Sequence, residues 1–143
     1  INAGQMLDVG DRQLHAIKPP TYDAPETVAL YDQKSGAFFS ADCFGAILEK
    51  PFDNAAEINS NDLKEGSHLW SSIDAPWLGI ADHNKFVSTL TNIERLNADI
   101  ILSAHLPPAV SMSNTLLSIL SDADQSSAFV GPDQQALEKM MAA

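Results

Sequence analysis

Two polar residues stand shortly after apolar runs that predict β-strands, and their types suit metal binding. Asp42 follows Ala37–Ser40 (AFFS) in SADCFGA, and His105 follows Asp99–Leu102 (DIIL) in LSAHLPPA. Open α/β sheets place their ligands outside strand ends, so a carboxylate and an imidazole in these positions can share one sheet edge. A hard oxygen donor with a borderline nitrogen donor suits zinc, iron or manganese. We therefore predict that Asp42 and His105 are two ligands of a larger metal site that this chain does not complete.

Each of these residues also has a simpler interpretation. Asp42 on its own is the kind of residue that caps a turn, and a lone histidine such as His105 is often a hydrogen-bonded structural residue. Asp23, in TYDAPET, is a third candidate ligand because it lies on a stiff proline-rich loop just before a predicted strand. Its alternative role is an Asx-turn before Ala24 and Pro25.

The other histidines and the single cysteine give weaker signals. His15, His68 and His83 have no suitably spaced second donor, so we expect them to be surface or packing residues. Because Cys43 is the single cysteine, the chain cannot form an internal disulfide. This fits a reducing compartment and predicts a cytoplasmic location. Because Cys43 follows a carboxylate that would raise its pKa, we expect a small buried thiol and not a nucleophile. A phosphate-binding glycine loop and a G-x-S-x-G elbow are both absent from the sequence.

The elements that position these residues follow from hydrophobic patterning. Alternating or β-branched runs predict strands over Gln13–Ile17, Thr27–Tyr31 and Ala37–Ser40, and Asp32–Gly36 (DQKSG) has the composition of a hairpin turn. A fourth strand is predicted over Asp99–Leu102.

Helical patterning follows the hairpins. Apolar residues at three- and four-residue spacing predict a helix over Asp82–Asn97, with Asp82 as a candidate N-cap. Two more helices are predicted over Ser113–Ser121 and Pro132–Met141, the second because proline is favoured at the first helical position. The polar and then aromatic segment Asn61–Trp77 predicts only short helices and loops.

Composition limits the possible partners. The chain has 143 residues, of which 45% are hydrophobic, and a formal net charge of −11. Such an acidic chain repels phosphate backbones and anionic headgroups, so we expect no nucleic acid and no membrane among its partners. No apolar run approaches the roughly 20 residues that cross a bilayer.

One long segment resembles a known family. KPPTYDAPETVALYDQKSGAFFSADCFGA is similar to the second half of a metallo-β-lactamase-fold domain, in particular its flavodiiron-like branch, where a hairpin strand ends in a pattern like S-x-D-x-F-G. Ser40, Asp42, Phe44 and Gly45 fit that pattern, and the resemblance covers roughly residues 8–110. It implies an α/β fold: half of an αββα sandwich, with one mixed sheet flanked by helices. Residues 1–143 would form a single partial domain with a helical tail over 111–143.

The resemblance implies a dinuclear zinc or iron site in the complete domain. Asp42 would bridge the metals and His105 would be the last ligand, whereas Asp23 stands where the family has a loop histidine. The family's H-x-H/E-x-D-H cluster, which supplies most ligands of the first metal, is not in this sequence. The chain would therefore hold about half a site, and the alternative to zinc or iron is that this fragment alone binds no metal.

Three functions follow from the resemblance. The first is a metal-dependent hydrolase that is active only when the missing half is supplied; the second is a flavodiiron-like oxidoreductase acting on oxygen or nitric oxide. The third is a degenerate fragment without catalysis. The opening residues INAGQMLDVGD lack both an initiator Met and signal-peptide features, so we expect a processed or truncated product. The expected partner is the missing N-terminal half or a second copy of the chain.

Overall fold

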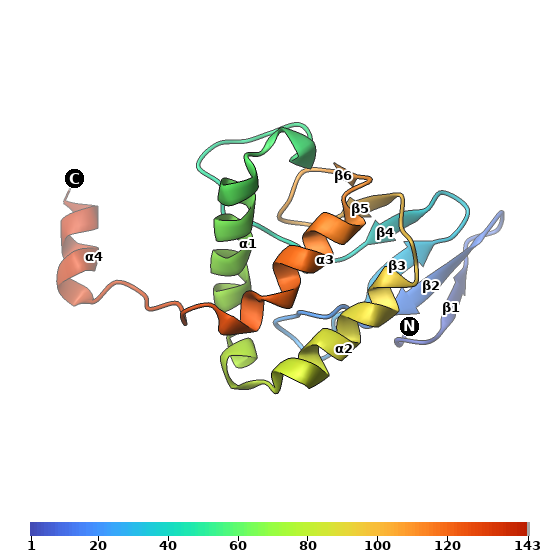
Figure 1. The fold of residues 1–143 in the computed structure, drawn as a ribbon, viewed down its shortest axis with the longest axis horizontal. Helices are drawn as coiled ribbons and strands as arrows, with labels where there is room; N and C mark the ends of the chain where they lie inside the picture. The colour runs from blue at the N-terminus through green and yellow to red at the C-terminus, as the bar shows by residue number, and fades with distance from the viewer. Residues whose placement is uncertain (143) are drawn as a thin grey trace.

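The structure, a computed structural model, describes residues 1–142 and contains one six-stranded mixed sheet (Figure 1). The strands follow one another across the sheet in chain order, and all neighbours are antiparallel except β4 and β5, which are parallel. The strands are β1 (Met6–Asp8), β2 (Gln13–Ile17), β3 (Ala29–Asp32), β4 (Ala37–Phe39), β5 (Ile100–Leu102) and β6 (Ala109–Val110).

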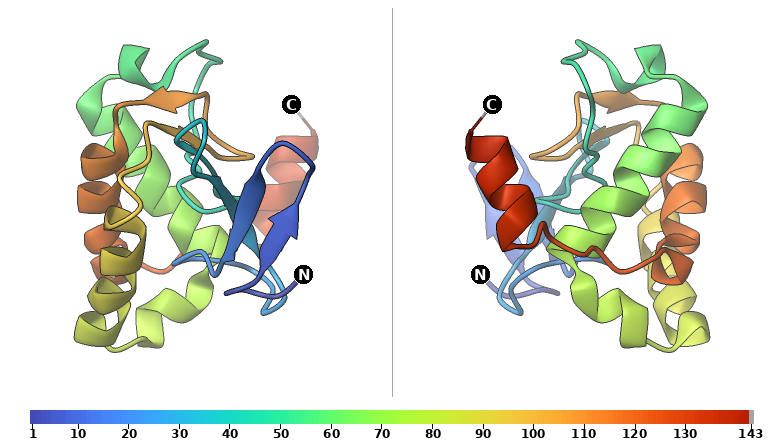
Figure 2. Two further views of the ribbon diagram at one scale, coloured as in Figure 1. Left: turned by 90° about the vertical axis from the view of Figure 1, so that its right-hand side faces the viewer. Right: turned by 90° about the vertical axis from the view of Figure 1, so that its left-hand side faces the viewer.

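Three α-helices cover one face of this sheet, as the two side views show (Figure 2). A fourth helix, α4, lies at the end of an extended segment and buries no residue. No helix within residues 1–142 is both long and apolar enough for a bilayer span. The α-helices are α1 (Ser60–Asp74), α2 (His83–Glu94), α3 (Ser113–Ser121) and α4 (Gln134–Met141), and the 3₁₀ helices are η1 (Ala55–Glu57), η2 (Pro76–Ile80) and η3 (Ala123–Gln125).

The core lies between the sheet and the three helices. Tyr31, Phe38 and Ile101 are neighbours across β3, β4 and β5 and point toward the helices, and Phe38 is 0% exposed. Leu63 of α1 and Leu116 of α3 are also fully buried. Burying side chains of this size contributes roughly 1.5–3 kcal/mol each, so this inner row fixes the register of the strands that lead to Asp42 and His105.

The opposite face of the sheet is apolar as well. Leu30, Phe39 and Leu102 are paired across the same three strands, one residue along from the inner row, so their side chains lie on the other face. Phe39 is 44% exposed there. We call Leu30, Phe39 and Leu102 the outer row.

The expected fold class is confirmed: the chain is α/β, with a mixed six-stranded sheet and α-helices, consistent with half of a metallo-β-lactamase sandwich. The predicted helix over Ser113–Ser121 has the observed bounds, and Asp82 caps α2 by accepting a hydrogen bond from the Lys85 amide at 2.9 Å.

The prediction of short helices and loops over Asn61–Trp77 is wrong. The segment forms the 15-residue helix α1 followed by η2. Its buried positions are Leu63, Gly66, Ser67 and Ser71. Small and polar residues occupy most of these buried positions. The sequence therefore lacks the apolar residues at three- and four-residue spacing that normally predict a helix.

Two smaller differences concern element ends. The last helix begins at Gln134 and not at Pro132, because the Asp133 side chain is the N-cap and accepts from the Ala136 amide at 2.8 Å. Strands β1 and β6 were not predicted; they have three and two residues, too few to show alternation.

Candidate metal centre

Asp42 and His105 meet at the edge of the sheet where β4 and β5 end. Since these strands are parallel, their carboxyl ends lie at the same edge. The Nε2 atom of His105 is 3.0 Å from Oδ1 of Asp42. The Asp42 side chain is 30% exposed and that of His105 is 43% exposed, so both are accessible to an ion from solvent.

The backbone around Asp42 is held tightly. The Ser40 hydroxyl donates to the Cys43 carbonyl at 2.8 Å, and the Ala104 amide donates to the Ala41 carbonyl at 2.9 Å. Ala41 and Phe44 both have positive φ, a conformation that costs non-glycine residues energy and needs support from its surroundings. These bonds supply that support and fasten the loop after β4 to the loop after β5.

Trp70 of α1 contacts both the Asp42 backbone and the His105 ring. Its indole Nε1 donates to the Asp42 carbonyl at 2.9 Å, and its ring lies on the His105 imidazole with ring centroids 4.0 Å apart. A Cβ atom at Gly45 would come within 2.5 Å of Trp70 Nε1. Glycine is therefore required at this position of the S-x-D-x-F-G pattern, since no other residue lets the indole come so close.

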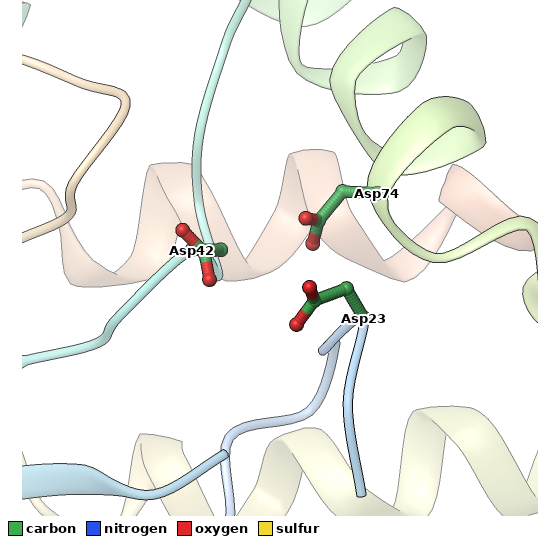
Figure 3. A group of neighbouring side chains, drawn as sticks. All are labelled: Asp23, Asp42 and Asp74. Atoms are coloured by element: carbon green, nitrogen blue, oxygen red, sulfur yellow. The ribbon is translucent and has the colours of Figure 1, made fainter.

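Two more carboxylates converge on Asp42. Asp23 comes from the loop before β3 and Asp74 from the last residue of α1, and the side chains of both extend toward Asp42 (Figure 3). One ligand atom from each lies within 4.8 Å of the others. Three separate elements thus bring three carboxylates together, and the His105 imidazole contacts one of them, Asp42.

Asp74 is the most perturbed of the three carboxylates. Its Oδ2 atom is buried and has no hydrogen-bond partner among the described residues. Burial, and to a lesser extent the neighbouring charges of Asp42 and Asp23, raise the pKa of Asp74 to about 6, while His105 acts in the opposite direction.

The Asp23 loop is fixed to the end of α1 by aromatic residues. The Trp77 indole donates to the Tyr22 carbonyl at 2.9 Å, and the two rings pack with centroids 5.2 Å apart. Because Tyr22 directly precedes Asp23 and Trp77 is three residues after Asp74, this contact holds the two carboxylates close together.

All three residues singled out from the sequence, Asp23, Asp42 and His105, thus lie in one place, and their role as ligands stays a prediction. Asp74 was missed, since the helix that carries it was not predicted. Its only sequence signal is a carboxylate two residues ahead of Pro76, where a helix is expected to end.

The remaining histidines contact other groups. His15 packs edge-on against Tyr31, His68 Nε2 is 3.0 Å from the Ile119 carbonyl, and His83 pairs with Asp124 at 2.8 Å. Cys43 is fully buried, as expected, and burial raises its pKa to about 11. A thiol held so far from ionisation at neutral pH is a poor nucleophile.

The fold is similar to parts of several solved structures, among them a flavodiiron protein. The chain is similar to rubredoxin oxygen:oxidoreductase from Desulfovibrio gigas (TM-score 0.70, 15% identity, covering 90% of this chain and 32% of that one). It is also similar to the flavodiiron protein of Giardia intestinalis (TM-score 0.64, 18% identity, covering 87% and 30%). A third similar structure is the apo chemotaxis sensor ODP from T. denticola (TM-score 0.66, 16% identity, covering 97% and 53%).

These similarities confirm the resemblance at the level of fold. The chain spans about a third of the length of the first two proteins and about half of the length of the sensor. The sequence matches no protein-family model and no curated protein.

Proposed function

We propose that this chain is the metal-binding later half of a metallo-β-lactamase-type metalloprotein, with Asp42, His105 and Asp23 as ligands. The proposal depends above all on the 3.0 Å separation between His105 Nε2 and Asp42 Oδ1. Two adjacent ligands at about 2.1 Å from one metal ion stand about 3 Å apart when they subtend a right angle. The two side chains therefore already have the spacing of neighbouring ligands.

The residues present fit a divalent cation. Within residues 1–142, Asp74 Oδ2 is a buried oxygen without a hydrogen-bond partner, and the nearby groups are two more carboxylates and the imidazole that contacts Asp42. Oxygen and imidazole donors together suit zinc and iron, the metals that the fold family implies. When bound, such an ion would supply Lewis-acid activation of water or binding of oxygen.

The chain's own residues would orient the ligands. The indole of Trp70 restrains the Asp42 backbone and the plane of the His105 ring at the same time. The hydrogen bond from the Ala46 amide to the His105 carbonyl, 3.0 Å long, keeps the loop after β5 against the loop after β4. Ligand geometry is thus set by neighbours as well as by the strands themselves.

We propose metal-dependent hydrolysis as the activity of the completed site. A catalytic zinc has three protein ligands and a water, and a dinuclear centre needs more ligands than Asp23, Asp42 and His105 provide. The alternative is a diiron oxidoreductase acting on oxygen or nitric oxide. It is favoured by one observation, that similar solved structures include flavodiiron proteins.

Metal content tests the ligand assignment. In the intact protein we expect Asp42→Ala and His105→Ala each to abolish metal binding, measured by elemental analysis after purification. His15→Ala and Asp53→Ala remove the same groups at positions that form no hydrogen bond or ion pair with Asp42 or His105, and should keep the wild-type stoichiometry. Zinc in the wild-type protein would favour hydrolysis and iron the oxidoreductase; unchanged metal content in both ligand variants would exclude the proposed site.

A further inference from the structure

Asp74 is the group at this site that the family resemblance does not include. It is the last residue of α1, whereas Asp42 and His105 follow strands and Asp23 lies in the loop before β3. We propose that Asp74 is a further metal ligand, supplied by α1. With it, this chain by itself holds one divalent first-row cation through three carboxylates and the His105 imidazole. The inference builds on the metal-binding function proposed above and adds a ligand to it.

The spacing of the three carboxylates fits a single ion. Ligands bound opposite one another at about 2.1 Å stand about 4.2 Å apart, and ligands at right angles about 3 Å apart. Oxygens of Asp23, Asp42 and Asp74 all lie within 4.8 Å of one another, so movements of a few tenths of an ångström bring them onto one centre. Figure 3 shows that Asp23 and Asp74, which come from different elements, extend toward Asp42.

One carboxylate oxygen of Asp74 lacks a hydrogen-bond partner within residues 1–142. Buried polar atoms in folded proteins almost always have a partner. Asp74 Oδ2 has none among the described residues, although the indole of Trp70, four residues earlier on the same helix, finds its partner on Asp42. A cation between the carboxylates would supply that partner.

Charge leads to the same assignment. Three carboxylates held this close repel one another strongly, because the interaction between two like charges a few ångströms apart reaches several kcal/mol in a partly buried site. No lysine or arginine bonds to Asp23, Asp42 or Asp74 in residues 1–142. A divalent cation is the simplest group that offsets this charge, and three oxygen donors with one nitrogen favour an ion such as Mn²⁺ or Fe²⁺.

Titration calorimetry with Mn²⁺ on the purified full chain tests the inference. We expect one ion per chain for the wild type and about 100-fold weaker binding for Asp74→Asn, which keeps the shape of the side chain and removes its charge. Asp74→Glu should recover part of the affinity. Asp62→Asn removes a carboxylate from the first turn of the same helix and is the matched control; it should bind as the wild type does.

A spectroscopic measurement separates ligation from support of the fold. The absorption bands of bound Co²⁺ depend on the number and type of its ligands, so loss of Asp74 should change their position and intensity at saturating metal. Wild-type affinity and an unchanged Co²⁺ spectrum in Asp74→Asn would overturn the inference. If Asp42→Ala and His105→Ala still abolished binding in that case, the proposed function would stand without Asp74. Absence of Mn²⁺ binding to the wild-type chain would also overturn it, since the chain would then need further ligands.

Discussion

At the scale of single residues, the site depends on the close approach of Trp70 to the loop that carries Asp42. The indole contacts both predicted ligands, through a hydrogen bond to the Asp42 carbonyl and through its ring on His105. Neither contact involves a charge. The geometry of the ligands is therefore sensitive to the volume of a residue, Gly45, that has no chemistry of its own.

Gly45→Ala tests this dependence. The added Cβ atom would stand 2.5 Å from Trp70 Nε1, so the indole must move. We expect a loss of about 1–3 kcal/mol in the free energy of unfolding, as for other overpacked sites, and weaker metal binding. Denaturant unfolding followed by Trp fluorescence measures the first effect and calorimetry the second. Gly79→Ala, where nothing lies within 4 Å of the added atom, should change stability by less than about 0.5 kcal/mol; equal effects from both variants would contradict the argument.

At the scale of elements, the β3–β4 hairpin positions Asp42, and the Asp32 carboxylate stabilises the turn of this hairpin. Asp32 accepts hydrogen bonds from the Ser35 hydroxyl at 2.6 Å, from the Lys34 amide at 2.9 Å and from Arg12 at 2.9 Å. The Ser35 and Arg12 bonds lower the pKa of Asp32 to about 2, more than burial raises it. The Asp32 side chain is 7% exposed, so its charge is held inside this network.

The pH dependence of stability follows from the sign of that shift. A carboxylate whose pKa is lowered in the folded state stabilises the protein above its unfolded pKa, near 3.8, and the contribution is lost as pH falls through about 2. We expect Asp32→Asn to lower the melting temperature at pH 7, and the gap to the wild type to close between pH 4 and pH 2. The exposed Glu49→Gln is the control and should show no such gap. A gap that persisted at pH 2 would mean that the charge of Asp32 is not the cause.

The same scale shows what the sequence could predict. Asp42 and His105 could be predicted because each follows a short apolar run that indicates a buried strand. Phe38 and Ile101 lie in the middle of these two runs. Asp74 was out of reach, because α1 buries Gly66, Ser67 and Ser71 against the core and so lacks an apolar stripe. The convergence of three carboxylates also depends on the packing of Trp77 on Tyr22, which is a tertiary contact with no local signal.

At the scale of the whole molecule, α1, α2 and α3 cover one face of the sheet, and within residues 1–142 no helix packs on the other face (Figure 2). The outer row of Leu30, Phe39 and Leu102 lies on that second face, and Val110 of β6 is also exposed. Contiguous exposed apolar residues mark surfaces that bind another protein. This is the face on which we expect the other half of the sandwich in the complete protein.

We expect the chain on its own to use this face to self-associate. Sedimentation at micromolar concentration should show dimers or larger species, and Phe39→Asp should convert them to monomers, because burying an unpaired charge in an interface costs several kcal/mol. Val130→Asp, which places the same charge at an exposed position outside the sheet, should leave association unchanged. A monomeric wild-type chain would contradict the expectation.

The parallel pairing of β4 with β5 has a consequence for the order of events in folding. His105 and Asp42 are 63 residues apart in sequence, and α1 and α2 lie between them. Bringing them together closes a long loop and lowers the conformational entropy of the chain. Packing of the intervening helices offsets this loss, so the contact forms after they have packed. We therefore expect the two predicted ligands to come together late in folding, so an ion bound between them would stabilise the folded molecule and would not nucleate it.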